Sequence, residues 1–362
     1  MQSSDADWRA LPLSALGEFA LIARLTRDLE TRPDVVLSAG DDAALLDPGA
    51  SSDTLLVATC DAQVEGRHFL RDIATPEEIG HKALAVNLSD IAAMGAEPLW
   101  ALVSLMLPPE LDVDVLDGVY AGMRALARRY DVAIVGGNVA ATAGPLTLDV
   151  TLLGRVARNY ALTRGGGRPG DALLVTGALG AAAAGLLAFV PPAMASARVS
   201  PDILALVRRA LVAPEPRVAE GRALAAVDVV TALLDVSDGL VADLGHLCDA
   251  SGVGAVVKAD LVPIAPETVA VCSASGRDAL ELALAGGEDY ELLCAVRPEG
   301  IERALDAVRA VGGVASPIGY LTDATRGISL QKRDGTTLPL PRAGWDHLRT
   351  ALRSPDSDAG AG

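Results

Sequence analysis

Aromatic residues and positive charge are both scarce in this chain of 362 residues. Phenylalanine, tryptophan and tyrosine make up only 3% of it, and 47 acidic residues outnumber 30 Lys and Arg, giving a formal net charge of −17. Nucleic acids and anionic membranes require a basic face. We therefore expect neither as a partner. An acidic protein can still bind a nucleotide when metal ions bridge its carboxylates to the phosphates.

Closely spaced cysteines and a basic leader are also missing. The four cysteines lie far apart, at positions 60, 248, 272 and 294, and no C-x-x-C pair occurs. This spacing predicts neither a zinc site nor a disulfide framework. The residues from Met1 to Asp5 carry no basic segment. No secretory signal is therefore predicted, and the cytoplasm is the expected location.

Charge is absent altogether from Ala172 to Ala197, a run long enough to suggest a membrane span. The run is interrupted, however, by three glycines and by Pro191-Pro192. These residues favour a buried strand, a glycine turn and an Ala-rich helix. We expect no membrane span. The turn Gly177–Gly180 opens the helix and can offer backbone N–H groups to an anion.

The common nucleotide-binding motifs are not present either. No G-x-x-x-x-G-K-[ST] and no H-R-D-x-x-x-x-N occurs in the sequence. The stretch Gly165–Gly170 matches G-x-G-x-x-G, but it contains Pro169 and precedes a strand rather than opening a helix, so we reject it. Any nucleotide must then be held through metal ions instead of a lysine cradle.

The order of helical and strand patterns predicts an α/β (α+β) fold with two domains. The chain is long enough for two cores, and we expect domains at 14–155 and 165–345, a basic Gly-rich linker at 155–168, and a disordered tail at 346–362. Predicted helices are 14–30, 76–95, 114–130, 240–250, 266–275, 277–284 and 299–311, with a helical segment near 201–226. Predicted strands are 55–59, 99–107, 132–135, 146–153, 172–176, 228–234, 255–258, 292–296 and 314–320.

Acidic residues stand where predicted strands end. The strand 228–234 runs into Asp235-Val-Ser-Asp238-Gly, and a helix follows. Open α/β sheets bind ligands at such places, and carboxylate oxygens suit Mg2+. The alternative for Asp238 is a helix N-cap. Similar acids occur at Asp41-Asp42, at Asp61 and at Glu288-Asp289.

Asp90 is the acid that does not fit a turn. It shares the otherwise apolar face of the helix 76–95 with Asn87. A buried carboxylate needs a partner. We consider two partners, a structural salt bridge to Lys82 or a metal ion. Because crowded carboxylates repel one another, a site that gathers all these acids requires cations.

Five stretches together resemble the thiamine-monophosphate kinase family. They are Gly40-Asp-Asp-Ala-Ala-Leu-Leu46, Asp61 to Phe69, Lys82 to Ala96, Asp235-Val-Ser-Asp-Gly-Leu240 and Gly286-Gly-Glu-Asp-Tyr-Glu-Leu292, in the family's order from about Gly17 to Trp345. The wider superfamily includes aminoimidazole ribonucleotide synthetase and selenophosphate synthetase. The resemblance implies a two-domain architecture of that superfamily and a homodimer formed by the N-terminal domains, with the strand 99–107 as a candidate contact.

The resemblance also implies an activity and a set of site residues. It implies ATP-dependent phosphorylation of thiamine monophosphate to thiamine diphosphate, by direct in-line transfer with several Mg2+ ions. The implied metal ligands are Asp41, Asp42, Thr59, Cys60, Asp61, Asp90, Asp235 and Asp238, of which Asp61, Asp90 and Asp238 are the expected catalytic residues. Implied nucleotide contacts are Arg164, Ser237, Gly137 and Asn138. Implied contacts to the thiamine phosphate are His68, Glu288 and Trp345.

Two positions depart from the family pattern. Cys60 replaces a threonine, and Asn138-Val139-Ala140 replace the Asp-Thr-Thr of the family's Gly-Gly-Asp-Thr-Thr motif. One anionic ligand and several hydroxyls are thereby lost. We expect a working enzyme. The alternatives are a degenerate paralogue that binds nucleotide or thiamine phosphate without turnover, and another ATP-dependent enzyme of the same superfamily.

Overall fold

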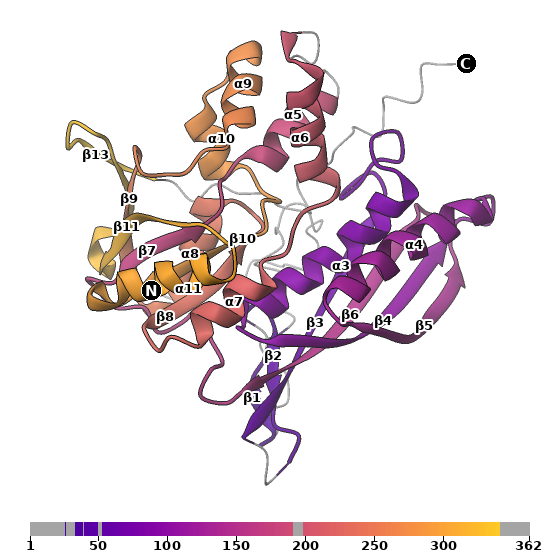
Figure 1. The fold of residues 1–362 in the computed structure, drawn as a ribbon, viewed down its shortest axis with the longest axis horizontal. Coiled ribbons are helices and arrows are strands. Elements are labelled where there is room, and N and C mark those ends of the chain that lie inside the picture. Colours follow the sequence, from indigo (N-terminus) through magenta and orange to yellow (C-terminus); the bar gives the residue numbers. More distant parts are fainter. Residues whose placement is uncertain (1–25, 27–32, 39, 50–52, 191–197, 341–362) are drawn as a thin grey trace, which may run out of the picture.

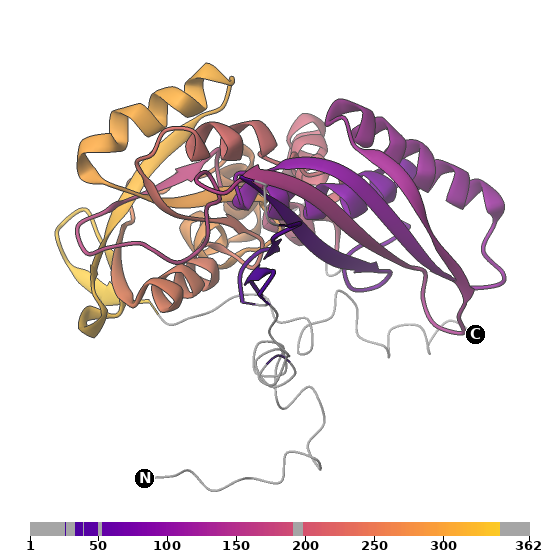
Figure 2. The same cartoon turned by 90° about the horizontal axis from the view of Figure 1, so that it is seen from below.

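The computed structural model describes residues 26, 33–38, 40–49, 53–190 and 198–340. In this part of the chain two β-sheets lie side by side (Figures 1 and 2). The first sheet has the order β1-β2-β3-β6-β4-β5. Its strands are β1 (Val35–Leu37), β2 (Ala44–Leu46), β3 (Thr54–Val64), β4 (Glu97–Leu107), β5 (Ala133–Ala141) and β6 (Thr147–Ala157). Only the β4–β5 pair is parallel.

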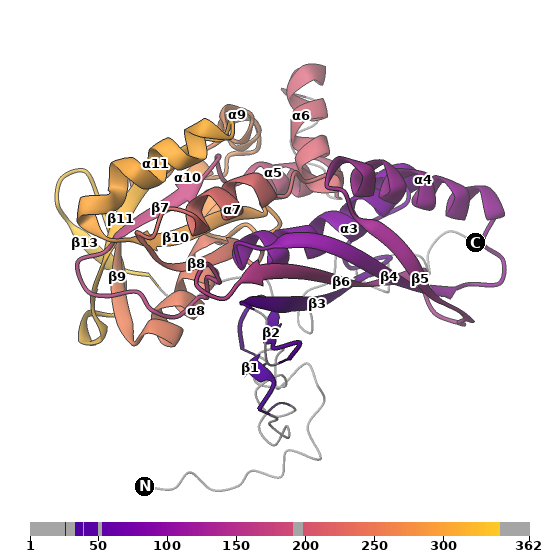
Figure 3. The same ribbon diagram turned by 60° about the horizontal axis from the view of Figure 1, so that its bottom comes forward.

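Two helices, α3 (Pro76–Ala93) and α4 (Val113–Arg129), cover one face of the first sheet (Figure 3). The start of α3 is set locally, because Thr75 and Glu78 form a reciprocal capping box and Pro76 occupies the first turn. Glycines let the two helices touch: a Cβ on Gly122 would lie 1.8 Å from the carbonyl oxygen of Glu77. The other face of the sheet carries no helix of the described chain.

The second sheet has the order β13-β12-β9-β11-β7-β10-β8 and is antiparallel except for the β12–β9 pair. Its strands are β7 (Ala172–Thr176), β8 (Val230–Val236), β9 (Val253–Lys258), β10 (Glu291–Val296), β11 (Ala315–Asp323), β12 (Ile328–Gln331) and β13 (Thr337–Pro339). Its helices are α5 (Ala181–Phe189), α6 (Pro201–Val212), α7 (Val218–Ala225), α8 (Leu240–Ser251), α9 (Pro266–Ser275), α10 (Ala279–Ala285) and α11 (Ile301–Ala310).

Helix α3 belongs to both layers. Its buried residues Leu84 and Leu88 are in one continuous apolar cluster that also contains Leu148 of the first sheet and Leu233 and Leu292 of the second. A fully buried leucine contributes about 1.5–3 kcal/mol relative to an exposed one. The cluster therefore holds the two sheets together, with α3 between them.

Most predicted elements are confirmed, and the mixed α/β architecture with them. The helix 266–275 matches α9, and the segment 201–226 forms the two helices α6 and α7. The uncharged run begins with β7 and α5 as expected, and no described helix has the length and apolarity needed to cross a membrane. The helix predicted at 14–30, except for Thr26, and the tail from 346 lie outside the described residues.

Some strand limits were wrong. The prediction ended one strand at Thr59 and another at Val135, whereas β3 continues to Val64 and β5 to Ala141. Gly137 is required not for a turn but for the close approach of β5 to β4, because a Cβ there would lie 1.8 Å from the carbonyl oxygen of Val103. The strands β12 and β13 were not predicted.

Candidate active site at the junction of the two sheets

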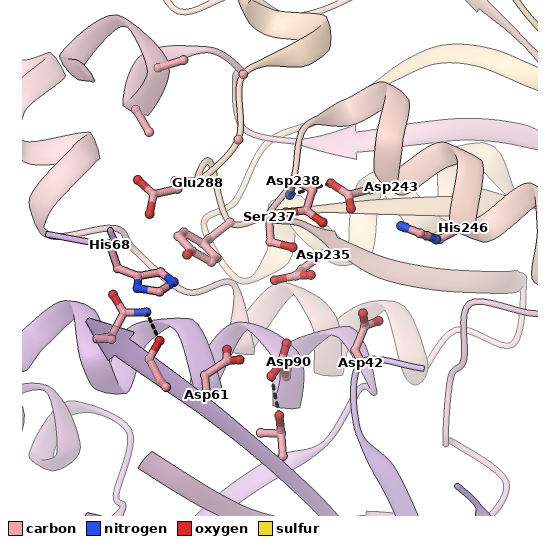
Figure 4. A pocket seen from close by; sticks show the side chains of 18 of the residues that line it. Asp42, Asp61, His68, Asp90, Asp235, Ser237, Asp238, Asp243, His246 and Glu288 are labelled. Carbon is pink, nitrogen blue, oxygen red and sulfur yellow. Dashed lines mark hydrogen bonds between the residues drawn. The ribbon is translucent and has the colours of Figure 1, made fainter. Parts of the chain in front are cut away.

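A cavity of about 380 Å3 is lined by residues of both sheets. Eight acidic side chains lie in its wall. They are Asp41, Asp42, Asp61 and Asp90 from the first half, and Asp235, Asp238, Asp243 and Glu288 from the second. Figure 4 shows Asp42, Asp61 and Asp90 on one side of a common space, with Asp235 and Asp238 opposite. The cavity therefore requires both halves of the chain.

Three of these acids converge most closely. Carboxylate oxygens of Asp42, Asp90 and Asp235 lie within 4.8 Å of one another. Burial and neighbouring negative charges raise the pKa of Asp42 to about 8 and that of Asp235 to about 6, and they raise the pKa of Asp90 well above its usual value. Among the described atoms, Oδ2 of Asp42 is buried without a hydrogen-bond partner. Such a set of oxygens fits a hard divalent cation.

The pleat of β3 places Asp61. Successive strand residues point to opposite faces, so Thr59 and Asp61 face α3, where Oγ1 of Thr59 donates to Oδ2 of Asp90 at 2.5 Å. Asp61 lies inside β3 and not at its carboxyl end as predicted, because the ladder to β6 continues through Val64. The expected neighbourhood of Asp61 and Asp90 arises from a strand face packed on a helix.

Cys60 points the other way. Its thiol donates to Oδ1 of Asp149 at 3.0 Å and accepts a hydrogen bond from Thr151 on the neighbouring β6. The side chain therefore lies on the sheet face opposite Asp42, Asp90 and Asp235, which we call the acidic cluster, although the residue still borders the cavity. Its thiol is not placed to be a metal ligand. The threonine hydroxyl that Cys60 replaces in the family pattern therefore has no counterpart at the cluster.

A second group of possible ligands was missed in the sequence. Asp238, Asp243 and His246 bring carboxylate and ring atoms within 4.8 Å of one another. Asp243 and His246 are one turn apart on α8, a spacing that would have revealed them. Oδ2 of Asp243 accepts the backbone N–H groups of Asp238 and Gly239 at 3.1 and 3.0 Å. The alternative that Asp238 caps this helix is wrong, because the N-cap position of α8 is Gly239 and no side chain makes a cap hydrogen bond there.

The residues expected to bind nucleotide are divided. Ser237 and Arg164 line the cavity, and the Arg164 guanidinium bonds to Asp42 while its backbone N–H donates to Asp41 at 3.0 Å. Gly137 and Asn138 do not line it. They lie on β5, and Asn138 pairs with Ser104 of β4, separated from β3 by two strands. The cavity of a single chain therefore does not include them, because β5 continues where a turn was expected, and their assignment to the nucleotide site stays a prediction.

His68 and Glu288 lie on a different side of the cavity from the acidic cluster (Figure 4). His68 follows β3, and its Nδ1 accepts the backbone N–H of Val64 at 3.0 Å. Glu288 has a left-handed φ of 67° and bonds to Lys82 at 2.7 Å. The alternative of a Lys82–Asp90 salt bridge is therefore wrong. Trp345 lies outside the described residues.

The N-terminus of α5, which the sequence suggested as an anion site, binds a carboxylate of the protein itself. The carboxylate of Asp289 accepts the backbone N–H groups of Gly180 at 2.8 Å and of Ala182 at 3.5 Å. Burial raises the pKa of Asp289 to about 7, against the effect of these hydrogen bonds. The Gly177–Gly180 turn therefore anchors the loop that carries Glu288.

Both halves of the chain match the models of one known protein family. Family models described as the N-terminal and C-terminal domains of AIR synthase related proteins match residues 40–156 and 168–330. Fold and matches together define a two-domain protein of the AIR synthase-related class.

Relatives within that class are more specific. The chain is 41% identical to a thiamine-monophosphate kinase of Salmonella typhimurium, covering 93% of this chain and 99% of the relative. It is 35% identical to that of Bacillus subtilis, covering 92% and 100%. A solved structure described as AaThiL complexed with AMPPCP and TMP aligns with a TM-score of 0.80 at 32% identity, covering 93% and 99%. The chain belongs to the thiamine-monophosphate kinase family and is an enzyme of the kinase class.

Proposed function

We propose that the protein transfers the terminal phosphoryl group of ATP to the phosphate of thiamine monophosphate, giving ADP and thiamine diphosphate. The observation that carries the proposal is the convergence of Asp42, Asp90 and Asp235 oxygens within 4.8 Å in a cavity built by both sheets. Relatives that are thiamine-monophosphate kinases over nearly their whole length, and one solved with AMPPCP and TMP, support the choice of substrates.

The acidic cluster is the proposed seat of several Mg2+ ions. Asp42, Asp90 and Asp235 would hold them, with Asp61 and Asp238 at the edges, Asp41 close by and the Thr59 hydroxyl beside Asp90. Bound Mg2+ neutralises the phosphate oxygens and the charge that develops during phosphoryl transfer. The buried, unpartnered Oδ2 of Asp42 is the feature of this chain that such an ion would satisfy.

The remaining side chains divide between the two substrates. Arg164 and Ser237 are proposed to contact the nucleotide, and the guanidinium can exchange its bond to Asp42 for a phosphate when cations occupy the cluster. His68 and Glu288 are proposed to contact the thiamine phosphate, because Glu288 offers a carboxylate to its cationic ring. That Trp345 stacks on the thiamine phosphate stays a prediction.

The transfer is proposed to be direct. The attacking atom is an oxygen of the acceptor phosphate, which is already anionic and needs no strong base. The bond from the γ-phosphorus to the bridging oxygen of ATP breaks as the new bond forms. Catalysis is then positioning and charge neutralisation. A phosphoenzyme trapped from γ-labelled ATP would contradict this route.

A coupled assay of ADP release tests the proposal. ATP turnover should require thiamine monophosphate and should stop on addition of EDTA, and mass spectrometry should identify thiamine diphosphate. Phosphorylated aminoimidazole precursors tested as acceptors would reveal another activity of the superfamily. Binding of ATP or thiamine monophosphate by calorimetry without any turnover would instead establish a degenerate paralogue.

A homodimer is part of the proposal. On β4, Trp100 and Leu102 alternate with buried residues, so they share one face of the sheet, where they are 43% and 42% exposed. Such an apolar patch marks an interaction surface, and a second copy of the chain would cover it. The domain limits 14–155 and 165–345 and the cytoplasmic location also stay predictions.

A further inference from the structure

Lys82 is a buried lysine whose ammonium group joins two loops of the cavity. The residue is 2% exposed and lies on α3. Its Nζ donates to the backbone oxygen of His68 at 2.8 Å and to Oε1 of Glu288 at 2.7 Å. His68 follows the strand β3 of the first sheet, whereas Glu288 precedes β10 of the second. One side chain therefore fixes the distance between two segments that belong to different sheets.

The loops that carry His68 and Glu288 line the cavity, whereas Lys82 does not. His68 and Glu288 line the main cavity, and the side chain of Glu288 remains 29% exposed. Lys82 does not line the main cavity but a small apolar pocket next to it, with Phe69 and Leu186. A ligand in the cavity can therefore touch His68 and Glu288 without touching Lys82.

The backbone of Glu288 is in the left-handed region and is fixed by a hydrogen bond to the second sheet's loop. The residue has a φ of 67°, a conformation that costs energy for a side chain other than glycine. Its N–H donates to the backbone oxygen of Ser237 at 2.7 Å, next to Asp238. The ion pair with Lys82 supplies the fixed point at the other end of the side chain. Together the two contacts set the carboxylate relative to both the His68 loop and the acidic cluster.

We propose that Lys82 is a positioning residue for the phosphate acceptor: it holds the carboxylate of Glu288 and the loop of His68 in the arrangement that binds thiamine monophosphate. This inference rests on the proposed function. It assigns Lys82 an effect on the acceptor and none on the nucleotide.

Loss of the Lys82 charge and loss of its positioning contacts should change the affinity for thiamine monophosphate in opposite directions. Thiamine monophosphate carries a cationic thiazolium ring. Removing a positive charge beside Glu288 should by electrostatics alone strengthen the attraction of that ring. Removing the group that positions Glu288 and His68 should weaken binding. The sign of the change in KM therefore separates the two effects.

The experiment compares Lys82→Met with the wild type and with Lys332→Met. The control removes a lysine charge at an exposed residue that does not line the cavity. We expect Lys82→Met to raise KM for thiamine monophosphate about tenfold or more, as the loss of a charge-assisted hydrogen bond implies. KM for ATP should stay the same and kcat should change little. Lys332→Met should leave all three constants unchanged.

A double-mutant cycle with Glu288→Gln completes the test. Lys82 acts through Glu288 and the neighbouring loop. The KM of the double variant for thiamine monophosphate should therefore be about as high as that of the single variant with the higher KM, and not higher. Lys82→Arg, which keeps the charge and the N–H donors, should recover part of the loss. If Lys82→Met does not fold, Lys82→Gln takes its place, and the same split between the two KM values is required.

Three results would overturn the inference: an unchanged or lowered KM for thiamine monophosphate in the Lys82 variant, an equal rise of both KM values, or additive effects in the cycle. A wild-type protein that does not phosphorylate thiamine monophosphate would overturn the proposed function instead. The two failures are therefore distinguishable.

Discussion

Ser89 on α3 donates a hydrogen bond of 2.6 Å to Oδ2 of Asp235 on β8. Both residues are buried, and the bond joins the helix of the first layer to an aspartate of the acidic cluster in the second. It favours the ionised form of Asp235 and so opposes the rise in pKa that burial causes there. The helix that carries Asp90 thus also tunes Asp235.

Ser89→Ala should weaken cation binding at this cluster. Asp235 loses a hydrogen bond to its charged form, worth about 1.5–3 kcal/mol. The Mg2+ concentration for half-maximal activity should rise on the order of tenfold or more. Titration of ATP turnover with Mg2+ measures the change. Ser273→Ala, at an exposed serine that bonds to its own helix, is the control, and an unchanged Mg2+ dependence in Ser89→Ala would contradict the prediction.

Asp90→Asn should separate activity from stability. In the absence of metal, burial first, and then the neighbouring charges of Asp61, Asp235 and Asp42, raise the pKa of Asp90. Removing one charge from this group should leave the melting temperature unchanged or raise it, while kcat falls on the order of 100- to 1000-fold.

The matched control for this prediction is Asp260→Asn at an exposed site. Calorimetry in EDTA and the coupled assay give the two readouts. A variant that unfolds would show that Asp90 is a structural residue and not a ligand.

Leu102→Asp should disrupt the proposed dimer. A charge at a residue that becomes buried between two copies costs several kcal/mol when it is unpaired. Light scattering at micromolar concentration should show a dimer for the wild type and a monomer for the variant. Leu206→Asp, at a leucine 53% exposed on α6, should remain dimeric. A monomeric wild type would end the hypothesis.

Asp289→Asn should change how stability depends on pH. The pKa of Asp289 is raised to about 7 in the folded protein, above its usual value of 3.8. The stability that its protonated form contributes is therefore present below about pH 4 and is lost as pH rises toward 7. The variant cannot ionise, so it should gain roughly 1 kcal/mol or more on the wild type between pH 5 and pH 8.

Denaturant unfolding in EDTA at the two pH values measures this difference. Asp334 provides the control, since its pKa is lowered by the backbone N–H of Thr336 and it is ionised at both values. The difference between Asp334→Asn and the wild type should not change with pH. The prediction fails if Asp289→Asn behaves in the same way.

Local patterns in the sequence were sufficient for the elements with strong end signals. Pro76 and the glutamates after it predicted the start of α3, and the capping box at Thr75 explains why. The strands β3 and β5 were predicted too short, because glycine and polar residues resemble strand ends. Both continue since a neighbouring strand supplies backbone partners along their whole length, which no local pattern records.

The sequence by itself determined the family, the identity of the acids and the expectation that they meet, because these depend on short motifs with constrained spacing. Tertiary structure alone decided the partners. It paired Lys82 with Glu288 and not with Asp90, added Asp243 and His246 to the cavity, and turned the Cys60 thiol away from the cluster. The physical reason is that side-chain partners are set by which faces pack together, and residues far apart in the chain become neighbours only when both sheets close on α3.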